Sequence, residues 1–151
     1  THCISSAASD VYKRQLLTLV ERKSLYVHIV HLGQTRTTTK TISCALACLR
    51  SSHAYSVTFD NGKEFSEHRR ITEAGIETYF ADPYKSIQRA RNENTNGLIR
   101  QYLPKSSSFD EVSNEQIEQI EFALNHRPRK TLGWYTPSEV MAGFYTVALA
   151  A

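Results

Sequence analysis

Two acidic residues stand out in this 151-residue chain because of the segments in which they occur. The first, Asp60, lies in the segment VTFDNGKEF and follows an apolar run that is typical of a β-strand. A carboxylate at the carboxyl end of a strand lies at the sheet edge where α/β proteins bind their ligands. Asp-Asn-Gly is also an ordinary turn sequence. Taken alone, the segment therefore indicates either a functional acid or a turn.

The second acid, Glu93, lies in the segment RNENTNGLIRQY, together with Asn92, Asn96, Gly97 and Arg100. In a helix, Glu93, Gly97 and Arg100 would share one face. A glycine inside a helix costs roughly 1 kcal/mol relative to alanine, so we expect tight packing or a ligand to compensate. Asparagine side chains are poor in helix interiors but suit hydrogen bonding beside DNA. The alternative is a polar, solvated helix start.

Considered together, the two acids indicate a site for divalent metal ions. Asp60 ends one expected strand, and Glu93 opens a helix that follows the next strand. Phosphoryl transfer on DNA commonly uses two metal ions about 4 Å apart, held by acidic side chains. Mg²⁺ prefers carboxylate oxygens and water to histidine or cysteine. Two carboxylates brought together by the fold would suit this chemistry, which usually needs a third.

The elements that would position these acids form an alternating series, which predicts an α/β fold with a mixed sheet and flanking helices. The first two strands read as an antiparallel hairpin. Expected strands are 16–20, 25–32, 55–59 and 76–80. Expected helices are 37–49, 63–74 and 92–102, with two more beginning at Ser113 and Thr136. Both late helices carry capping signals, a glutamine or glutamate three residues after the serine or threonine.

The bulk composition is that of an ordinary folded domain. The chain is 40% apolar and 22% charged, with a net charge of +3. Disorder and membrane spans are poor interpretations, because no apolar run approaches the roughly 20 residues of a spanning helix. The small positive charge is compatible with nucleic acid without arguing for it. We interpret Cys3, Cys44 and Cys48 as small buried residues in a reducing cytoplasm.

The first fifteen residues, THCISSAASDVYKRQ, differ from the remainder of the chain. They are polar and lack useful periodicity, and SAASDVYKRQ resembles read-through of a sequencing adapter. We therefore expect residues 1–15 to be a non-native leader. Residues 16–142 would then form a partial catalytic core, and residues 143–151 a tail.

Five blocks of the sequence, in order along 16–142, resemble the bacterial IS-thirty family of insertion-sequence transposases. The blocks are LLTLVERKSLYV, DNGKEF, YFADPY, NENTNGLIRQYLPK and NHRPRKTLGWYTPSEV. A lone DNG or NEN would be a weak signal, but five blocks in family order are specific. The blocks around NENTNG and NHRPRK also argue against another RNase H-like nuclease, such as a retroviral-type integrase.

The resemblance implies an RNase H-like, retroviral-integrase-type core with a DDE triad and two Mg²⁺ (or Mn²⁺) ions. By motif, Asp60 is the second acid and Glu93 the third, and both would be catalytic metal ligands. The family's first acid lies on a strand just before the one matching 16–20. We expect that first strand to be missing, because the surroundings of Asp10 do not resemble the family's segment.

The resemblance also implies accessory residues. Asn61 would shape the turn that aims Asp60. His68 matches a histidine of the family's DNG block and would lie near the scissile phosphate, or else be a surface histidine. A basic patch in the last block would contact DNA phosphates, with a solvated turn as the alternative. The patch consists of Arg127, Arg129 and Lys130, and Asn92, Asn96 and Arg100 would join it in binding nucleic acid. We interpret Trp134 and Tyr135, which follow the patch, as packing residues rather than base-stacking ones.

The function implied is DNA transposition and integration by Mg²⁺-dependent strand cleavage and joining. Its partners would be double-stranded DNA and further copies of the chain, with no membrane, in the cytoplasm at the bacterial nucleoid. The family implies an enzyme, a DDE transposase, but we expect this chain to be inactive because it lacks the first catalytic aspartate. The alternative is a remnant that only binds DNA or a full-length relative.

Overall fold

The structure is a computed structural model that describes residues 2–6, 16–33, 37–60, 65–82, 86–104 and 112–150. The strands are β1 (His2–Ser6), β2 (Leu16–Glu21), β3 (Val27–His31), β4 (Ser56–Phe59) and β5 (Glu77–Phe80). The helices are α1 (Thr38–Ser51), α2 (Arg69–Glu73), α3 (Ser86–Tyr102), α4 (Asn114–Asn125) and α5 (Pro137–Ala150). A short 3₁₀-helix, Lys130–Leu132, lies between α4 and α5.

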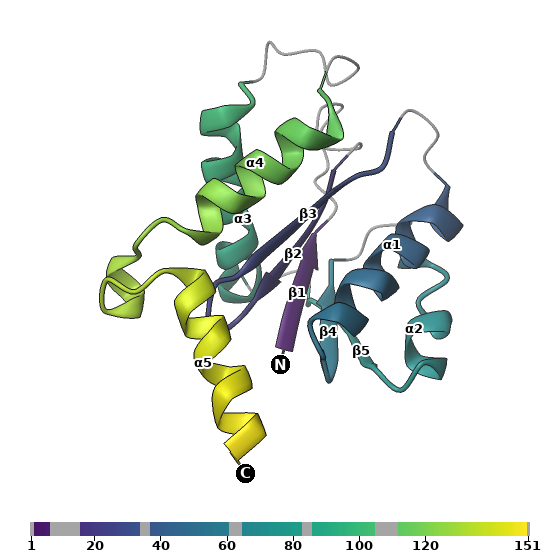
Figure 1. Cartoon of the computed structure of the whole chain (residues 1–151). Coiled ribbons are helices and arrows are strands. Elements are labelled where there is room, and N and C mark those ends of the chain that lie inside the picture. Colours follow the sequence, from purple (N-terminus) through teal and green to yellow (C-terminus); the bar gives the residue numbers. More distant parts are fainter. Residues whose placement is uncertain are drawn as a thin grey trace.

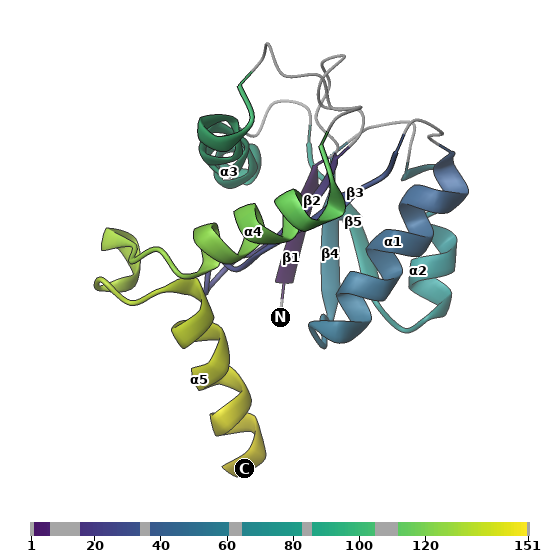
Figure 2. The ribbon, with the colours of Figure 1, turned by 45° about the horizontal axis from the view of Figure 1, so that its top comes forward.

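The five strands form one mixed sheet in the order β3-β2-β1-β4-β5 (Figure 1). The β1-β2 and β2-β3 pairs are antiparallel, whereas β1-β4 and β4-β5 are parallel. Helices α1 and α2 lie on one side of the sheet, and α3 and α4 lie on the other (Figures 1 and 2). The predicted α/β class, a mixed sheet with flanking helices, is confirmed.

The expectation that the first strand is missing is wrong for the fold. Strand β1 occupies the centre of the sheet, where Ile4 pairs with Val20 of β2 and with Thr58 of β4. A central strand can bond its backbone on both sides, so it forms without the apolar periodicity on which the prediction relied. Asp10 lies outside the described residues, and the interpretation of residues 1–15 as a non-native leader stays a prediction.

Strand β2 is buried along its whole length because both faces of the sheet are covered. Leu17 and Leu19 pack into the core under α1 and α2. Leu16 and Val20 belong to the second core, which includes Ile99 of α3. Successive side chains of a strand point to opposite faces. The apolar run of β2, broken only by Thr18 before Glu21, therefore suits an interior strand between two helical layers.

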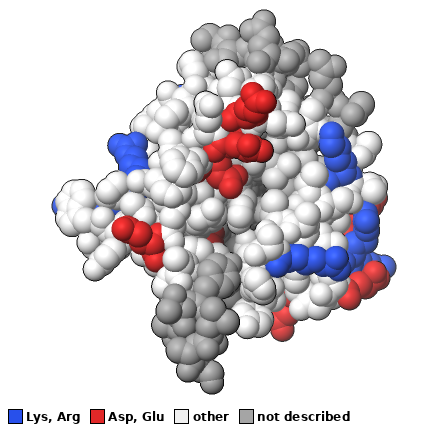
Figure 3. Space-filling view, in the orientation of Figure 1, with Lys and Arg blue, Asp and Glu red and all other residues white. Residues whose placement is uncertain are grey.

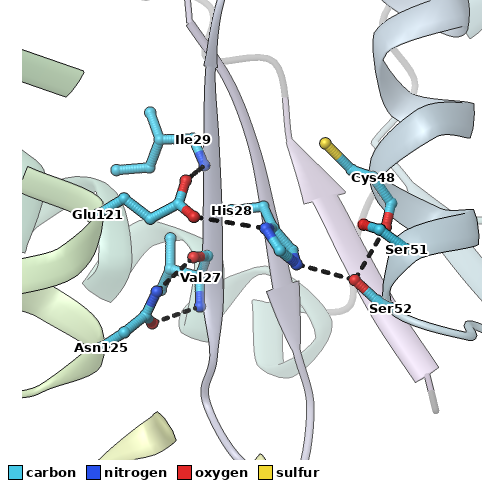
Figure 4. Close-up of polar contacts among 8 residues, drawn as sticks. All are labelled: Val27, His28, Ile29, Cys48, Ser51, Ser52, Glu121 and Asn125. Carbon is cyan, nitrogen blue, oxygen red and sulfur yellow. Dashed lines mark hydrogen bonds and ion pairs between the residues drawn. The ribbon is translucent and has the colours of Figure 1, made fainter. Parts of the chain in front are cut away.

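Helix α4 covers the outer edge of β3, and its side chains hydrogen-bond the backbone groups of that strand (Figure 4). The side chain of buried Asn125 accepts from the Val27 N–H and donates to the Val27 carbonyl, both at 2.8 Å. One turn earlier, Glu121 accepts from the Ile29 N–H at 2.7 Å. An exposed strand edge is a template for pairing with other chains, and these two side chains close it.

His28 of β3 connects α4 on one side of the sheet with the end of α1 on the other (Figure 4). Its Nδ1 lies 3.5 Å from a Glu121 oxygen, and its Nε2 lies 2.8 Å from the Ser52 hydroxyl. The order Ser-His-Glu resembles a hydrolase triad. However, Ser52 is buried and donates its own hydroxyl hydrogen to the Cys48 carbonyl at 2.9 Å. The three residues therefore connect β3 to the end of α1 and to α4.

The predicted helix starts are confirmed by their caps. Ser113 and Gln116 form a reciprocal capping box at the start of α4. Thr136 donates to the Glu139 carboxylate through its N–H and its hydroxyl. The Glu139 N–H in turn donates to the Thr136 hydroxyl oxygen. These hydrogen bonds hold the pKa of Glu139 below its usual value. Helix α2, by contrast, is shorter than the predicted 63–74 and begins only at Arg69.

The cysteines of α1 are packing residues, as expected from the sequence. Cys44 and Cys48 are free and half-buried, and burial, aided by the charge of Glu121, raises the pKa of the Cys48 thiol to about 11. Cys48 is therefore a protonated packing residue at neutral pH. Among the described helices, none has the length and apolar character needed to cross a membrane.

Candidate active site

Asp60 directly follows β4 and is half-buried at the carboxyl end of that strand. The chain on both sides of it is anchored by aromatic packing. Phe59 is fully buried and stacks on Phe65, with ring centroids 4.4 Å apart. The Phe59 carbonyl also accepts from the Ala81 N–H, just beyond β5. The backbone around Asp60 is therefore held by its flanks. Asn61 lies outside the described residues.

The neighbour of Asp60 across the sheet is set by the β1-β4 register. The last paired residues are Ser5 and Phe59, and both strands run in the same direction. One step further along each strand, Ser6 comes level with Asp60. The resemblance implies that the family's first acid lies on the strand before β2. That strand is present here, with a serine at the step beside Asp60.

Glu93 lies on the exposed face of α3, the helix that packs on β1 and β2. Glu93, Gly97 and Arg100 are all exposed, as expected for residues sharing a face. Thr95 and Ile99 are buried on the opposite side of the helix. The helix begins at Ser86, earlier than the predicted 92. Glu93 therefore lies within the helix rather than at its start.

The asparagines of α3 differ in environment. Asn96 is half-buried, and its Oδ1 accepts from the Thr18 hydroxyl of β2 at 3.4 Å. This contact gives Asn96 a role in seating α3 on the sheet, beside the role in nucleic-acid binding predicted for it. Asn94 is exposed. The side chain of Asn92 lies outside the described residues.

Gly97 has open space around it. A Cβ built at this position would meet no heavy atom within 4 Å among the described residues. Of the two expected compensations for a helical glycine, tight packing against described neighbours is therefore excluded. The exposed backbone beside Glu93 is accessible to a ligand.

The predicted metal ligands can be compared with the described side chains. Asp60 and Glu93 offer carboxylate oxygens, the donors that Mg²⁺ prefers. Among the described residues, however, no group of three or more His, Cys, Asp or Glu side chains could hold a metal ion. The donor chemistry fits, but no described His, Cys, Asp or Glu side chain completes a group of three with them. The assignment of Asp60 and Glu93 as ligands stays a prediction.

His68 lies just before α2, near the ends of the parallel strands. Its Nδ1 is 3.1 Å from the Phe65 carbonyl oxygen. Its ring packs edge-on against Phe80 of β5, with centroids 4.8 Å apart. Phe80 pairs in register with Phe59, so His68 lies at the same end of the sheet as Asp60. These contacts hold His68 against Phe65, which stacks on Phe59 next to Asp60, and against Phe80.

The three basic residues of the NHRPRK block do not form one uniform patch. Arg127 and Lys130 are exposed, and Arg127 donates to Gln101 at the end of α3 at 3.4 Å. Arg129 turns inward and donates to the Leu124 carbonyl at 3.3 Å. Burial, and then the charge of Arg127, lower the pKa of the Arg129 guanidinium.

The aromatic residues beyond this block are more exposed than expected. The sequence favoured packing roles for Trp134 and Tyr135, but they are 68% and 62% exposed. Gly133 and Trp134 both have a positive φ, so the chain turns sharply there and projects the aromatic pair outward. The packing prediction is therefore wrong for both residues.

The outer surface of α4 is acidic. Figure 3 shows a band of acidic side chains over α4, seen from the same side as in Figure 1. Glu115 and Glu118 are exposed on this helix, and Glu121 is half-buried. An acidic surface repels a phosphate backbone. The α4 face is therefore poorly suited to contact with nucleic acid.

Comparison with solved structures identifies the fold. The chain aligns with a chain of the simian T-cell lymphotropic virus intasome in complex with PP2A regulatory subunit B56 gamma, with a TM-score of 0.75. The alignment covers 93% of this chain and 53% of that one, at 20% sequence identity. The chain therefore has the fold predicted for it, an RNase H-like fold of the retroviral-integrase type.

Curated relatives of the chain include several insertion-sequence transposases, although no family model matches the chain. The chain is 36% identical to the IS30A transposase InsI of Escherichia coli K12 over 143 residues, 93% of this chain and 37% of that protein. It is 56% identical to the IS4351 transposase of Bacteroides fragilis over 86 residues, 56% of this chain and 26% of that protein. The chain spans only 26% and 37% of the length of these two relatives. It belongs to the bacterial IS30-type transposase family.

Proposed function

We propose that this chain contributes two acids of a DDE site that cuts and joins DNA during transposition. The main support is the position of Asp60 at the carboxyl end of β4, beside the central strand β1. Glu93 lies on α3, which packs on β1 and β2. Both acids thus belong to elements that meet at β1.

The proposed chemistry needs a divalent metal, Mg²⁺ or Mn²⁺. Asp60 and Glu93 would hold it through their carboxylates, and His68 would act as an accessory residue. When bound, two such ions supply activation of a water or 3′-hydroxyl and stabilisation of the leaving oxygen. The protein's own part is to hold the two acids on rigid elements and to orient the DNA.

The proposed partners are double-stranded DNA and further copies of the chain. The relatives are transposases by name, and the structural neighbour comes from an intasome. Exposed Arg100, Arg127 and Lys130 would contact phosphates, which position DNA without reading its sequence. Phosphate contacts of this kind give binding that weakens as salt rises.

A second candidate function is DNA binding without catalysis. It is favoured by one observation, the serine at the step of β1 beside Asp60. Two carboxylates without a third would hold the metals weakly, and strand cleavage would be slow or absent. This chain would then bind DNA, or a full-length relative, without cutting.

A single substitution separates the two candidates. Ser6→Asp puts a carboxylate at the position level with Asp60, and we expect it to produce nicking of supercoiled plasmid in Mn²⁺ where the unaltered chain nicks little. Adding Asp60→Asn to Ser6→Asp should abolish the gain. Calorimetric titration with Mn²⁺ should show tighter binding in the Ser6→Asp chain.

The matched control is Ser5→Asp, one step back along β1. Neighbouring positions of a strand face opposite sides of the sheet, so this carboxylate should leave nicking unchanged. Nicking that survives Asp60→Asn would contradict the proposed site. No gain from Ser6→Asp in a chain that still binds duplex DNA would favour the binding-only function.

A further inference from the structure

A cavity lies where three of the five sequence blocks meet. It has a volume of about 320 Å³. Arg22 and Lys23 come from the β2-β3 turn, Asn94 from α3, and Arg129 and Thr131 from the segment after α4. We call this site, defined by these five residues, the basic cavity. Segments far apart in the sequence thus form one concave surface.

The basic cavity carries one sign of charge. Its charged lining residues are Arg22, Lys23 and Arg129, and no acid is found among the described residues that line it. The nearest acid in the turn is Glu21, which is buried. The Glu21 carboxylate accepts from the N–H groups of Lys23 and Ser24, at 3.0 and 2.5 Å. These backbone donors fix the turn that presents Arg22 and Lys23.

Arg129 adds a polar group in need of an acceptor. Its Nε is buried and has no hydrogen-bond partner within the described part of the chain, although its Nη2 donates to the Leu124 carbonyl. A buried donor without an acceptor costs about 1–3 kcal/mol. An anion in the cavity would both pair with the guanidinium and offset the burial that lowers its pKa.

We infer that the basic cavity binds one phosphate group of the DNA backbone. The inference rests on the proposed function, and it assigns Arg22 and Lys23, beside Arg129, as phosphate-binding residues. Asn94 lines the cavity and adjoins Glu93 on α3, so a DNA strand at Glu93 would continue over the cavity. Thr131 adds a hydroxyl that can donate to a phosphate oxygen.

The binding of an anion is tested without DNA, by titrating inorganic phosphate into the full chain. The probe is the Nε–H resonance of Arg129 in a ¹H–¹⁵N correlation spectrum, assigned as the peak lost in Arg129→Lys. We expect this resonance to shift and saturate, and the shift to vanish in the Arg22→Gln/Lys23→Gln chain. A resonance that does not move, or that moves equally in the double variant, would overturn the inference.

The assignment of the anion as a DNA phosphate is tested by duplex binding across a salt series, without divalent metal. Loss of one phosphate contact should lower the slope of log affinity against log salt by about 0.9. We expect Arg22→Gln/Lys23→Gln to lower it by that amount on any sequence. The matched control is Arg69→Gln/Arg70→Gln, an adjacent exposed pair on α2 that should leave the slope unchanged.

The outcomes distinguish this inference from the proposed function. Equal losses in the two double variants, or no duplex binding by the unaltered chain, would overturn the phosphate assignment. Nicking by Ser6→Asp that depends on Asp60 would still support the proposed function in either case. Conversely, a slope change confined to the Arg22/Lys23 variant, without any nicking, would support the cavity and contradict the catalytic proposal.

Discussion

At the scale of single residues, Gly97 is a position where folding stability and the proposed function favour different amino acids. The glycine lies on the exposed face of α3, and a Cβ there would meet no heavy atom of the described residues within 4 Å. Folding stability alone would favour alanine at such a position. The accessible backbone beside Glu93 is consistent instead with a ligand that approaches the helix closely, as the proposed function requires.

We therefore predict opposite effects of Gly97→Ala on folding and on DNA binding. The free energy of unfolding should rise by about 0.5–1 kcal/mol, because the glycine loses more backbone entropy on folding than alanine does. Duplex affinity should fall, because the added methyl group occupies the approach to α3. Urea unfolding followed by circular dichroism measures the first effect, and fluorescence anisotropy measures the second. A stabilised chain with unchanged affinity would remove the ligand explanation for Gly97.

Individual residues were predictable where their signal is local. The caps at Ser113 and Thr136 depend on residues three positions apart, so the sequence alone contains them. Asn125 was missed as a structural residue because its partner, Val27, is distant in the sequence. Trp134 was misassigned because its exposure follows from positive φ angles that composition does not reveal.

At the scale of elements, α4 acts as a cover for the edge of the sheet. Its buried Asn125 bonds both backbone groups of Val27, and Glu121 bonds the Ile29 N–H. The helix thereby replaces the neighbour strand that β3 lacks on its outer side. Its apolar residues Ile117, Ile120 and Leu124 pack into the second core at the same time.

We predict that Asn125→Ala destabilises the fold by about 2–3 kcal/mol, because two backbone groups lose their partners at once. Gln119→Ala is the control, since Gln119 is exposed on the same helix and should change stability little. The stability of the Asn125→Asp chain should lie between those of the other two, because aspartate keeps an acceptor for the Val27 N–H but loses the donor. Urea midpoints of the three variants give the comparison. Equal midpoints for the Asn125→Ala and Gln119→Ala chains would show that solvent replaces the lost bonds.

The elements themselves were mostly predictable, and the exceptions have physical causes. Strands β2, β4 and β5 coincide with apolar runs that end at turn residues. Helix α3 begins at Ser86, earlier than the predicted 92, in the stretch SIQRAR, whose sequence offers little apolar periodicity. Strand β1 was missed because it lies in a polar stretch and is held by backbone pairing with β2 and with the distant β4.

At the scale of the whole molecule, β1 joins two halves of the sheet. On one side is the antiparallel hairpin β2-β3, and on the other is the parallel pair β4-β5. Without β1, facing edges of β2 and β4 would lose their backbone partners. The class of the fold was predictable from the alternation of strands and helices, but this central junction was not.

We predict that a chain lacking residues 1–15 shows no cooperative unfolding transition, because its sheet is divided at the centre. The control lacks residues 137–151, an equally long piece that contains α5 at the periphery (Figure 1). The control should still unfold cooperatively, at a lower midpoint. Thermal unfolding monitored by circular dichroism compares the two. An unchanged transition after loss of residues 1–15 would identify them as a dispensable leader.

The central position of β1 also sets an order of events during synthesis. His2, at the start of β1, pairs with Ser56 of β4, so β1 depends on a strand that is made much later. On the ribosome, β1, β2 and β3 can associate early, but the parallel half must wait for β4 to emerge. Such long-range parallel pairing is slow to form. The unpaired flank of β1 is therefore the part of the nascent chain most in need of protection from aggregation.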